Sequence, residues 1–135
     1  MGSALETHVY RTCVRSGIFG DVILSAAVNW HFGKKGDGNV TNEIDVMAVR
    51  GVKPIFISCK ATEIRTEALN ELAILRDRFG GAGSYAAIVS TANTGGRNNA
   101  AMKARAQELN ISVISVGEAK DENRLAERLK RIYGC

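Results

Sequence analysis

The sequence lacks the features that mark secreted, membrane-spanning and zinc-binding proteins. It has no apolar run long enough to cross a bilayer and no basic-then-apolar leader at its start. Its three cysteines are odd in number, widely spaced and without a C-x-x-C pair, and its two histidines have no metal-ligand spacing. These absences argue against export, a disulfide framework and a zinc site. We therefore expect a cytoplasmic protein with no membrane partner.

Linkers, internal repeats and low-complexity segments are also missing from the 135 residues. Hydrophobic residues make up 45% of the chain and charged residues 24%, which is the balance of a folded protein rather than a disordered one. The length suits one domain with a full core, so we expect a single domain over residues 1–135. The net charge of +4 permits a nucleic-acid partner without requiring one.

What the sequence does contain is a succession of helical and strand patterns. The first three predicted strands follow one another closely enough for an antiparallel meander, whereas helices between the later strands require parallel crossovers. We therefore predict an α/β fold with a mixed sheet flanked by helices on both faces. Apolar spacing places the predicted helices at 5–16, 67–79, 99–109 and 122–132, and the predicted strands at 21–30, 43–49, 54–60, 84–91 and 111–116.

Charges gather at the ends of one predicted hairpin, in the stretch NEIDVMAVRGVKPIFISCK. Because side chains alternate along a strand, Glu43 and Asp45 share a face near the start of one strand, and Ser58 and Lys60 share a face near the end of its partner. An antiparallel hairpin places these two ends side by side. Carboxylates gathered in this way bind Mg²⁺ or Mn²⁺, and a lysine beside them can orient water or stabilise charge on a phosphate. The simpler alternatives are solvated strand ends or a salt bridge between Lys60 and Asp45.

This stretch resembles the core of the PD-(D/E)xK nuclease superfamily, in which an acid on the first strand of a hairpin faces an acid-x-lysine on the second. The flanking segments GSALETHVY, LRDRFGG and MKARAQELNISVI make the chain similar to the C-terminal nuclease domain of CARF-fused effectors of type III CRISPR defence. The resemblance covers most of the chain, and only the hairpin core is specific to the superfamily. It implies a restriction-endonuclease-like fold and a metal-dependent endonuclease that hydrolyses phosphodiester bonds.

The same resemblance implies a cofactor and partners. The cofactor is Mg²⁺ or Mn²⁺, the substrate is single-stranded RNA or DNA, and the active form is a homodimer in antiviral defence. The related effectors bind cyclic oligoadenylate through an N-terminal sensory domain, and nothing in these residues resembles that domain. Control by cyclic oligoadenylate is therefore expected only through a sensory domain outside this sequence.

Carried over to this chain, the family pattern assigns roles to individual residues. Asp45 matches the main metal ligand and Lys60 the catalytic lysine. Glu6 matches the acid on the first helix that completes such sites. Glu43 either assists or forms a hydrogen bond nearby.

The chain departs from the family pattern at Ser58, where the family has an acid two residues before the lysine. A serine hydroxyl is a poor ligand for a hard dication. Either the site binds metal more weakly, or a glutamate of the next helix takes over, with Glu67 favoured over Glu71. The alternative for both glutamates is an exposed helix face. Ser58 also supports a second hypothesis, a catalytically impaired nucleic-acid-binding or dimerisation module of the same fold.

Basic residues outside the hairpin are candidates for nucleic-acid contacts. Lys34 and Lys35 lie in a glycine-rich loop, and Arg97 and Lys103 lie on or beside a later helix. Such side chains contact phosphate groups in many complexes, although each is by itself more typical of a solvated charge. A weaker hypothesis uses the loop 93–99 for nucleotide binding, since it follows a buried strand but lacks the lysine of a P-loop.

Overall fold

A computed structural model describes residues 4–27, 43–60, 64, 66–81, 83–90 and 97–133. These residues form a five-stranded sheet with the strand order β1-β2-β3-β4-β5, so strands that are consecutive in the sequence are neighbours in the sheet. The elements in chain order are α1 (Ala4–Ser16), β1 (Asp21–Ala27), β2 (Glu43–Arg50), β3 (Lys53–Lys60), α2 (Thr66–Phe79), β4 (Tyr85–Ser90), α3 (Arg97–Glu108), β5 (Ile111–Ile114), α4 (Val116–Lys120) and α5 (Glu122–Tyr133).

The sheet is mixed, as the sequence predicts. β1, β2 and β3 pair in antiparallel fashion, whereas β3, β4 and β5 pair in parallel through the crossover helices α2 and α3. The parallel strands therefore end at one edge of the sheet, where Lys60 of β3 is in register with Ser90 of β4. This edge is where the predicted site residues of β3 lie.

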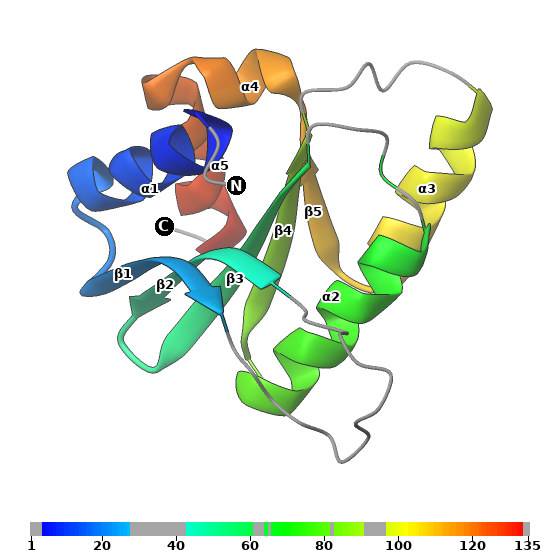
Figure 1. The fold of residues 1–135 in the computed structure, drawn as a ribbon, viewed down its shortest axis with the longest axis horizontal. Coiled ribbons are helices and arrows are strands. Elements are labelled where there is room, and N and C mark those ends of the chain that lie inside the picture. The colour runs from blue at the N-terminus through cyan, green and yellow to red at the C-terminus, as the bar shows by residue number, and fades with distance from the viewer. Residues whose placement is uncertain are drawn as a thin grey trace.

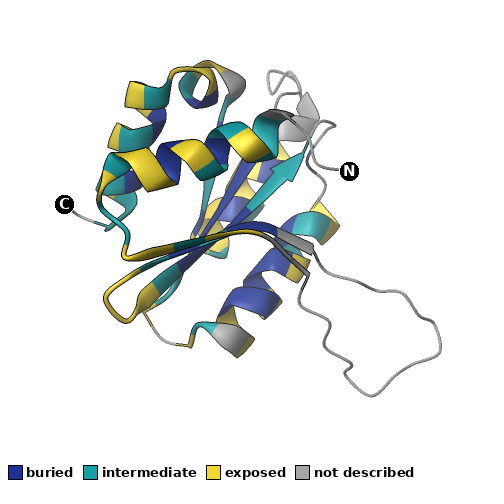
Figure 2. Ribbon diagram, turned by 60° about the vertical axis from the view of Figure 1, so that its left-hand side comes forward, coloured by how far each residue is buried: buried dark blue, intermediate teal, exposed yellow. Residues whose placement is uncertain are grey.

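Helices cover both faces of the sheet, with α1, α4 and α5 on one side and α2 and α3 on the other (Figure 1). Figure 2 shows the strands buried between them and the exposed residues on the outward sides of the helices. Each face has its own hydrophobic core. The core under α1 and α5 contains Val9, Cys13, Val46, Ala48, Ile55, Ile57, Ala87, Val89, Ile114, Ala119, Leu125 and Leu129. The core under α2 and α3 contains Phe56, Ile64, Leu69, Leu72, Ala73, Leu75, Ala86, Ile88, Met102, Ala106 and Ile111.

One helix was not expected from the sequence. The pattern predicts a strand over 111–116, but β5 ends at Ile114 and Val116 begins the short helix α4. Five residues make little more than one turn, which is too short to show a helical repeat of apolar residues. Asp121 caps α5, because its Oδ1 accepts a hydrogen bond of 2.9 Å from the backbone N–H of Asn123.

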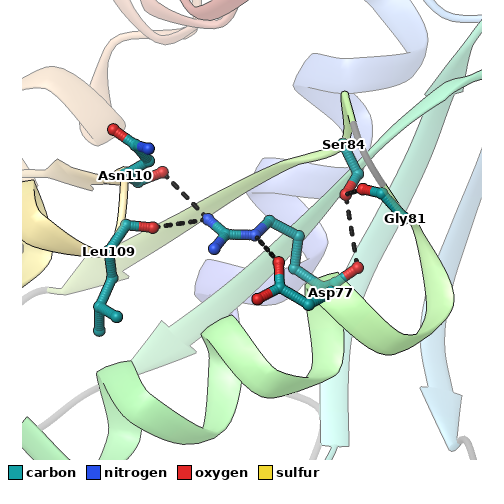
Figure 3. A network of polar contacts seen from close by, with 6 residues as sticks. Asp77, Gly81, Ser84, Leu109 and Asn110 are labelled. Atoms are coloured by element: carbon teal, nitrogen blue, oxygen red, sulfur yellow. Dashed lines mark hydrogen bonds and ion pairs between the residues drawn. The ribbon is translucent and has the colours of Figure 1, made fainter.

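A buried arginine ties α2 to the turn between α3 and β5. Arg76 donates from Nη1 to the main-chain oxygens of Leu109, at 2.7 Å, and of Asn110, at 3.2 Å. Its Nε forms a 3.0 Å ion pair with Asp77 (Figure 3). Asn110 has a positive φ of 58°, so these contacts hold a strained turn in place.

In the part of the chain that the structure describes, no helix is both long and apolar enough to cross a membrane.

Candidate active site

The candidate site lies where β2 and β3 separate. The two strands pair from Arg50↔Lys53 to Val46↔Ile57. Beyond that point β2 continues along β1 as far as Glu43, and β3 continues along β4 as far as Lys60. We call residues 43–45 of β2 together with residues 58–60 of β3 the strand fork. The fork lies at the carboxyl end of β3.

Asp45 occupies the fork with a buried carboxylate. Its side chain is only 8% exposed, and its Oδ2 accepts a hydrogen bond of 2.6 Å from the backbone N–H of Cys59. In a regular antiparallel pair such an N–H bonds to a carbonyl of the partner strand. Here the carboxylate takes that place, which compensates for part of the cost of burying a charge.

Three predicted site residues start from the same face of the sheet. Met47 and Phe56 pack into the core under α2 and α3. Because side chains alternate along a strand, Asp45 lies on the face of Met47, and Ser58 and Lys60 lie on the face of Phe56. The pairing of the two strands ends at Val46↔Ile57, so Asp45 and Ser58 are the first residues beyond it on each strand. The alternation places the three residues on one face, and their roles in a site stay predictions.

Lys60 is half-buried at the end of β3, in register with the fully buried Ser90. Within the described part of the chain it forms no hydrogen bond or ion pair, so the alternative of a salt bridge between Lys60 and Asp45 is not observed there. An ammonium group without a fixed partner is available to a bound anion.

Glu6 approaches the fork from the opposite face of the sheet. It lies in the first turn of α1, which covers the face where the Cys59 side chain packs. The pKa of the Cys59 thiol is raised well above its usual range, chiefly by burial and further by the negative charges of Asp45 and Glu6. Both carboxylates therefore lie within electrostatic reach of one residue, Cys59. The raised pKa also keeps this thiol protonated, which makes it a poor nucleophile.

The other predicted site residues are less closely gathered or are not described. Glu67 and Glu71 of α2 and Lys103 of α3 are exposed. Glu43 and Arg97 are described only in their backbone, and Lys34 and Lys35 lie outside the described residues. Considering only the side chains that the structure places, no three His, Cys, Asp or Glu residues form a group that could hold a metal ion.

Sequence reasoning missed two features of the fork. One is the main-chain N–H of Cys59 that holds Asp45, and the other is the buried Ser90 beside Lys60. The backbone N–H carries no signal in the sequence, because every residue except proline has one. Ser90 is a polar residue at the end of the continuous apolar run of a buried strand. This exception to the apolar pattern is the sequence signal that could have identified it.

A mixed five-stranded sheet with helices on both faces, and with an acid and a lysine on neighbouring strand ends, defines a restriction-endonuclease-like α/β nuclease fold. The chain belongs to the family of Card1-like endonuclease domains, whose family model matches residues 1–132. This membership confirms the nuclease resemblance drawn from the hairpin core.

Solved structures support the same fold. Protein VC1899 from Vibrio cholerae matches with a TM-score of 0.68 and 25% identity over 97% of this chain and 33% of its own. Can2 from Sulfobacillus thermosulfidooxidans, solved in complex with cyclic tetra-adenylate, matches with a TM-score of 0.66 and 18% identity over 96% of this chain and 35% of its own. The chain thus spans about a third of the length of either protein. The sequence matches no curated protein sequence.

Proposed function

We propose that this domain is a metal-dependent endonuclease that hydrolyses phosphodiester bonds in single-stranded RNA or DNA. The observation that carries the proposal is the strand fork, where the buried carboxylate of Asp45 and Lys60, which has no ion-pair partner among the described residues, start from one face. A cation that binds a phosphate and a carboxylate that holds a metal ion are groups that promote the hydrolysis of a phosphate diester. The family membership supports endonuclease chemistry for the domain.

The residues present fit a hard dication with few protein ligands. Mg²⁺ and Mn²⁺ prefer oxygen donors, and Mg²⁺ is commonly held by one or two carboxylates, with waters and substrate phosphates completing its shell. Asp45 and Glu6 are the two carboxylates proposed for this role, because the negative charge of each raises the pKa of the Cys59 thiol between them. Glu67 or Glu71 is the proposed further ligand. When bound, the ion supplies a polarised phosphate oxygen and a more acidic water.

The chain's own residues hold and neutralise charge. The Cys59 N–H fixes one oxygen of Asp45, so the carboxylate is oriented before any ligand arrives. Lys60 neutralises the charge that develops on the phosphate or positions the attacking water, with Glu43 and Ser58 as neighbours that assist by hydrogen bonding. Preorganised charges of this kind need no rearrangement during the reaction, which is the source of their catalytic effect.

Nucleic acid reaches the fork through phosphate contacts in this proposal. Lys103 stands on the exposed side of α3, at a cavity of about 460 Å³ that Ser112 and Arg128 also line. Lys34, Lys35 and Arg97 are the other proposed phosphate contacts. These contacts position the strand and carry no sequence preference.

The proposal extends to the assembly. By family resemblance the domain acts as a homodimer in a CRISPR-associated defence effector in the cytoplasm. Any response to cyclic oligoadenylate then belongs to a sensory domain outside these residues. Light scattering of the purified domain, alone and with nucleic acid, measures the dimer.

The second candidate function is a catalytically impaired module that binds nucleic acid or dimerises. Ser58 favours it, because the fork has a neutral hydroxyl two residues before Lys60, where an acid would strengthen metal binding. This candidate predicts nucleic-acid binding without cleavage.

A cleavage assay separates the two candidates. Labelled single-stranded RNA, single-stranded DNA and plasmid are incubated with Mn²⁺, with Mg²⁺ or with EDTA. Asp45→Asn and Lys60→Ala are compared with the matched controls Asp21→Asn and Lys53→Ala, which change exposed residues of β1 and of the far end of β3. Metal-dependent cutting that only the first pair abolishes establishes the nuclease. Binding without cutting by the wild type on every substrate establishes the impaired module.

A further inference from the structure

We propose that the outer edge of β5 is a docking site for an extended, acidic peptide segment of a partner protein. The segment pairs with β5 as a further strand of the sheet, and its apolar side chains alternate with polar ones. This inference goes beyond the proposed nuclease function and does not depend on it.

The position of β5 is the first step of the argument. β5 is the last strand of the described sheet, so no described strand pairs with its outer side (Figure 1). The outer side faces the cavity of about 460 Å³, whose lining comes from α3, from β5 and from the α4–α5 side. We call this cavity the β5 groove. It is long enough to follow the strand, because residues from Ile111 to Ser115 line it.

The main chain of β5 offers hydrogen-bonding groups to the groove. The carbonyl oxygen of Val113 accepts a hydrogen bond of 3.3 Å from Nη2 of Arg128, a residue of α5, so this carbonyl points away from β4. In a strand of a parallel sheet the N–H and C=O of one residue point to the same side, and the orientation repeats at every second residue. Ile111 therefore presents its main-chain groups to the groove as Val113 does. Such a row of groups is what an added strand pairs with.

Arg128 covers this edge only loosely. Its Nη1 bonds to both carboxylate oxygens of Glu118, at 2.8 and 3.0 Å, whereas its contact with Val113 is the longest of the three. A distance of 3.3 Å lies beyond the usual range for an N–H···O bond. An incoming strand can therefore replace this one contact while the ion pair between Arg128 and Glu118 stays intact.

The two walls of the groove differ in polarity. The lining on the α3 side includes apolar residues that belong to the core under α2 and α3 or pack against it: Ala106, Ile111 and Val113. The lining on the α4–α5 side is polar: Ser112, Ser115, Glu118 and Arg128. Because side chains alternate along a strand, an added strand presents every second side chain to each wall. The groove thus suits a segment in which apolar and polar residues alternate.

The charge of the groove favours an acidic peptide. Lys103 and Arg128 carry positive charges and Glu118 a negative one, so the lining has one positive charge in excess. Glu118 pairs with Arg128, whereas Lys103 takes part in none of the ion pairs formed by the described residues. A nucleic-acid strand carries a charge at every nucleotide and is held by several cations, whereas one uncompensated cation suits one acidic side chain.

Fluorescence anisotropy of labelled peptides tests the inference on the purified protein. One peptide of about ten residues alternates valine with glutamate, and a second alternates valine with lysine. A third is the glutamate peptide with N-methylated amides throughout, which cannot donate strand hydrogen bonds. A short single-stranded DNA is measured in parallel with EDTA, which prevents metal-dependent cleavage. The variant Lys103→Glu is compared with the matched control Lys120→Glu, which reverses the charge of an exposed residue of α4 outside the lining.

We expect the glutamate peptide to bind about tenfold or more tightly than its methylated form, because strand pairing supplies the main-chain hydrogen bonds. It is expected to bind about threefold or more tightly than the lysine peptide. Lys103→Glu is expected to reverse the order of the glutamate and lysine peptides, whereas Lys120→Glu leaves the order unchanged.

Three results would overturn the inference. The first is equal binding of the methylated and unmethylated peptides, or no binding of any peptide. The second is binding of single-stranded DNA alone, lost in Lys103→Glu, which assigns the groove to nucleic acid. The third is a dimer, seen by light scattering, that the glutamate peptide dissociates, which assigns the edge to a second copy of the chain. None of these measurements involves cleavage, so the proposed function is tested separately.

Discussion

Asp45 has a structural partner in addition to its proposed metal. Its Oδ2 satisfies the N–H of Cys59 at the point where β2 leaves β3. A substitution can therefore remove the charge and keep the hydrogen-bond acceptor, or remove both. The two kinds of variant separate the catalytic role of Asp45 from its role in the fold.

We expect Asp45→Asn to reduce cleavage about 1,000-fold or more, because about 4 kcal/mol of metal-dependent stabilisation of the transition state is lost. Asp45→Leu is expected to lose as much activity and, in addition, about 1–3 kcal/mol of stability relative to Asn, because the buried Cys59 N–H loses its acceptor. Urea denaturation and initial cleavage rates measure the two effects. Equal stability of the Asn and Leu variants would show that this hydrogen bond contributes nothing.

Lys60 is the opposite case, a charged residue without a fixed partner in the described part of the chain. We expect Lys60→Ala to change the free energy of unfolding by less than about 0.5 kcal/mol. Its cleavage rate is expected to fall about 100-fold, because the proposed phosphate-binding charge is removed. Lys53→Ala on the same strand is the control, and a loss of cutting in both variants would contradict a specific role for Lys60.

At the scale of the elements, the buried Arg76 connects α2 to the turn before β5. Arg76 donates hydrogen bonds to the main-chain oxygens of Leu109 and Asn110, which lie in the turn after α3 (Figure 3). Its planar guanidinium reaches both carbonyls and Asp77 at once, which a lysine cannot do.

We expect Arg76→Ala to destabilise the domain by about 1–3 kcal/mol, because two main-chain carbonyls and a turn at positive φ lose their anchor. Arg76→Lys is expected to recover about half of this loss. Thermal and urea unfolding measure both variants against Arg131→Ala, a change on an exposed face of α5. An Arg76→Ala variant as stable as that control would show that the turn holds without the arginine.

The molecule as a whole is two hydrophobic cores on either side of one sheet, and two cysteines belong to the same core. Burial raises the pKa of the Cys13 thiol from its ordinary value near 9 to about 12, and the pKa of Cys59 is raised by burial and by the charges of Asp45 and Glu6. Both thiols thus stay protonated in the folded protein at neutral pH, and both pack against the core under α1 and α5.

We therefore expect thiol reagents at pH 8 to react with Cys13 and Cys59 only when the domain unfolds, since on the order of one Cys13 in 10,000 is ionised at that pH. Because the folded-state pKa values are raised, their contribution to stability is full below pH 9 and declines as the pH rises toward 12. A Cys135→Ser background removes the third thiol, and labelling with and without urea gives the rates. Rapid labelling of the folded protein would contradict the buried placement.

The sequence by itself determined the features that depend on local patterns. Alternation along Glu43–Val49 and along the partner strand, the turn between them and the acid-x-acid and lysine positions were sufficient to predict the hairpin, its shared face and the mixed sheet. The cap that Asp121 forms on α5 is also a local feature, because it joins residues two apart in the chain.

Only the tertiary structure decided how the fork is built. It showed that β2 follows β1 while β3 follows β4, that the Cys59 N–H holds Asp45, and that Glu6 approaches from the other face of the sheet. These relations join segments far apart in the chain or use backbone groups that are the same in every residue except proline, so no local pattern encodes them. The site is therefore recognisable from its residue types, whereas the number of ligands it can offer a metal depends on how the strands separate.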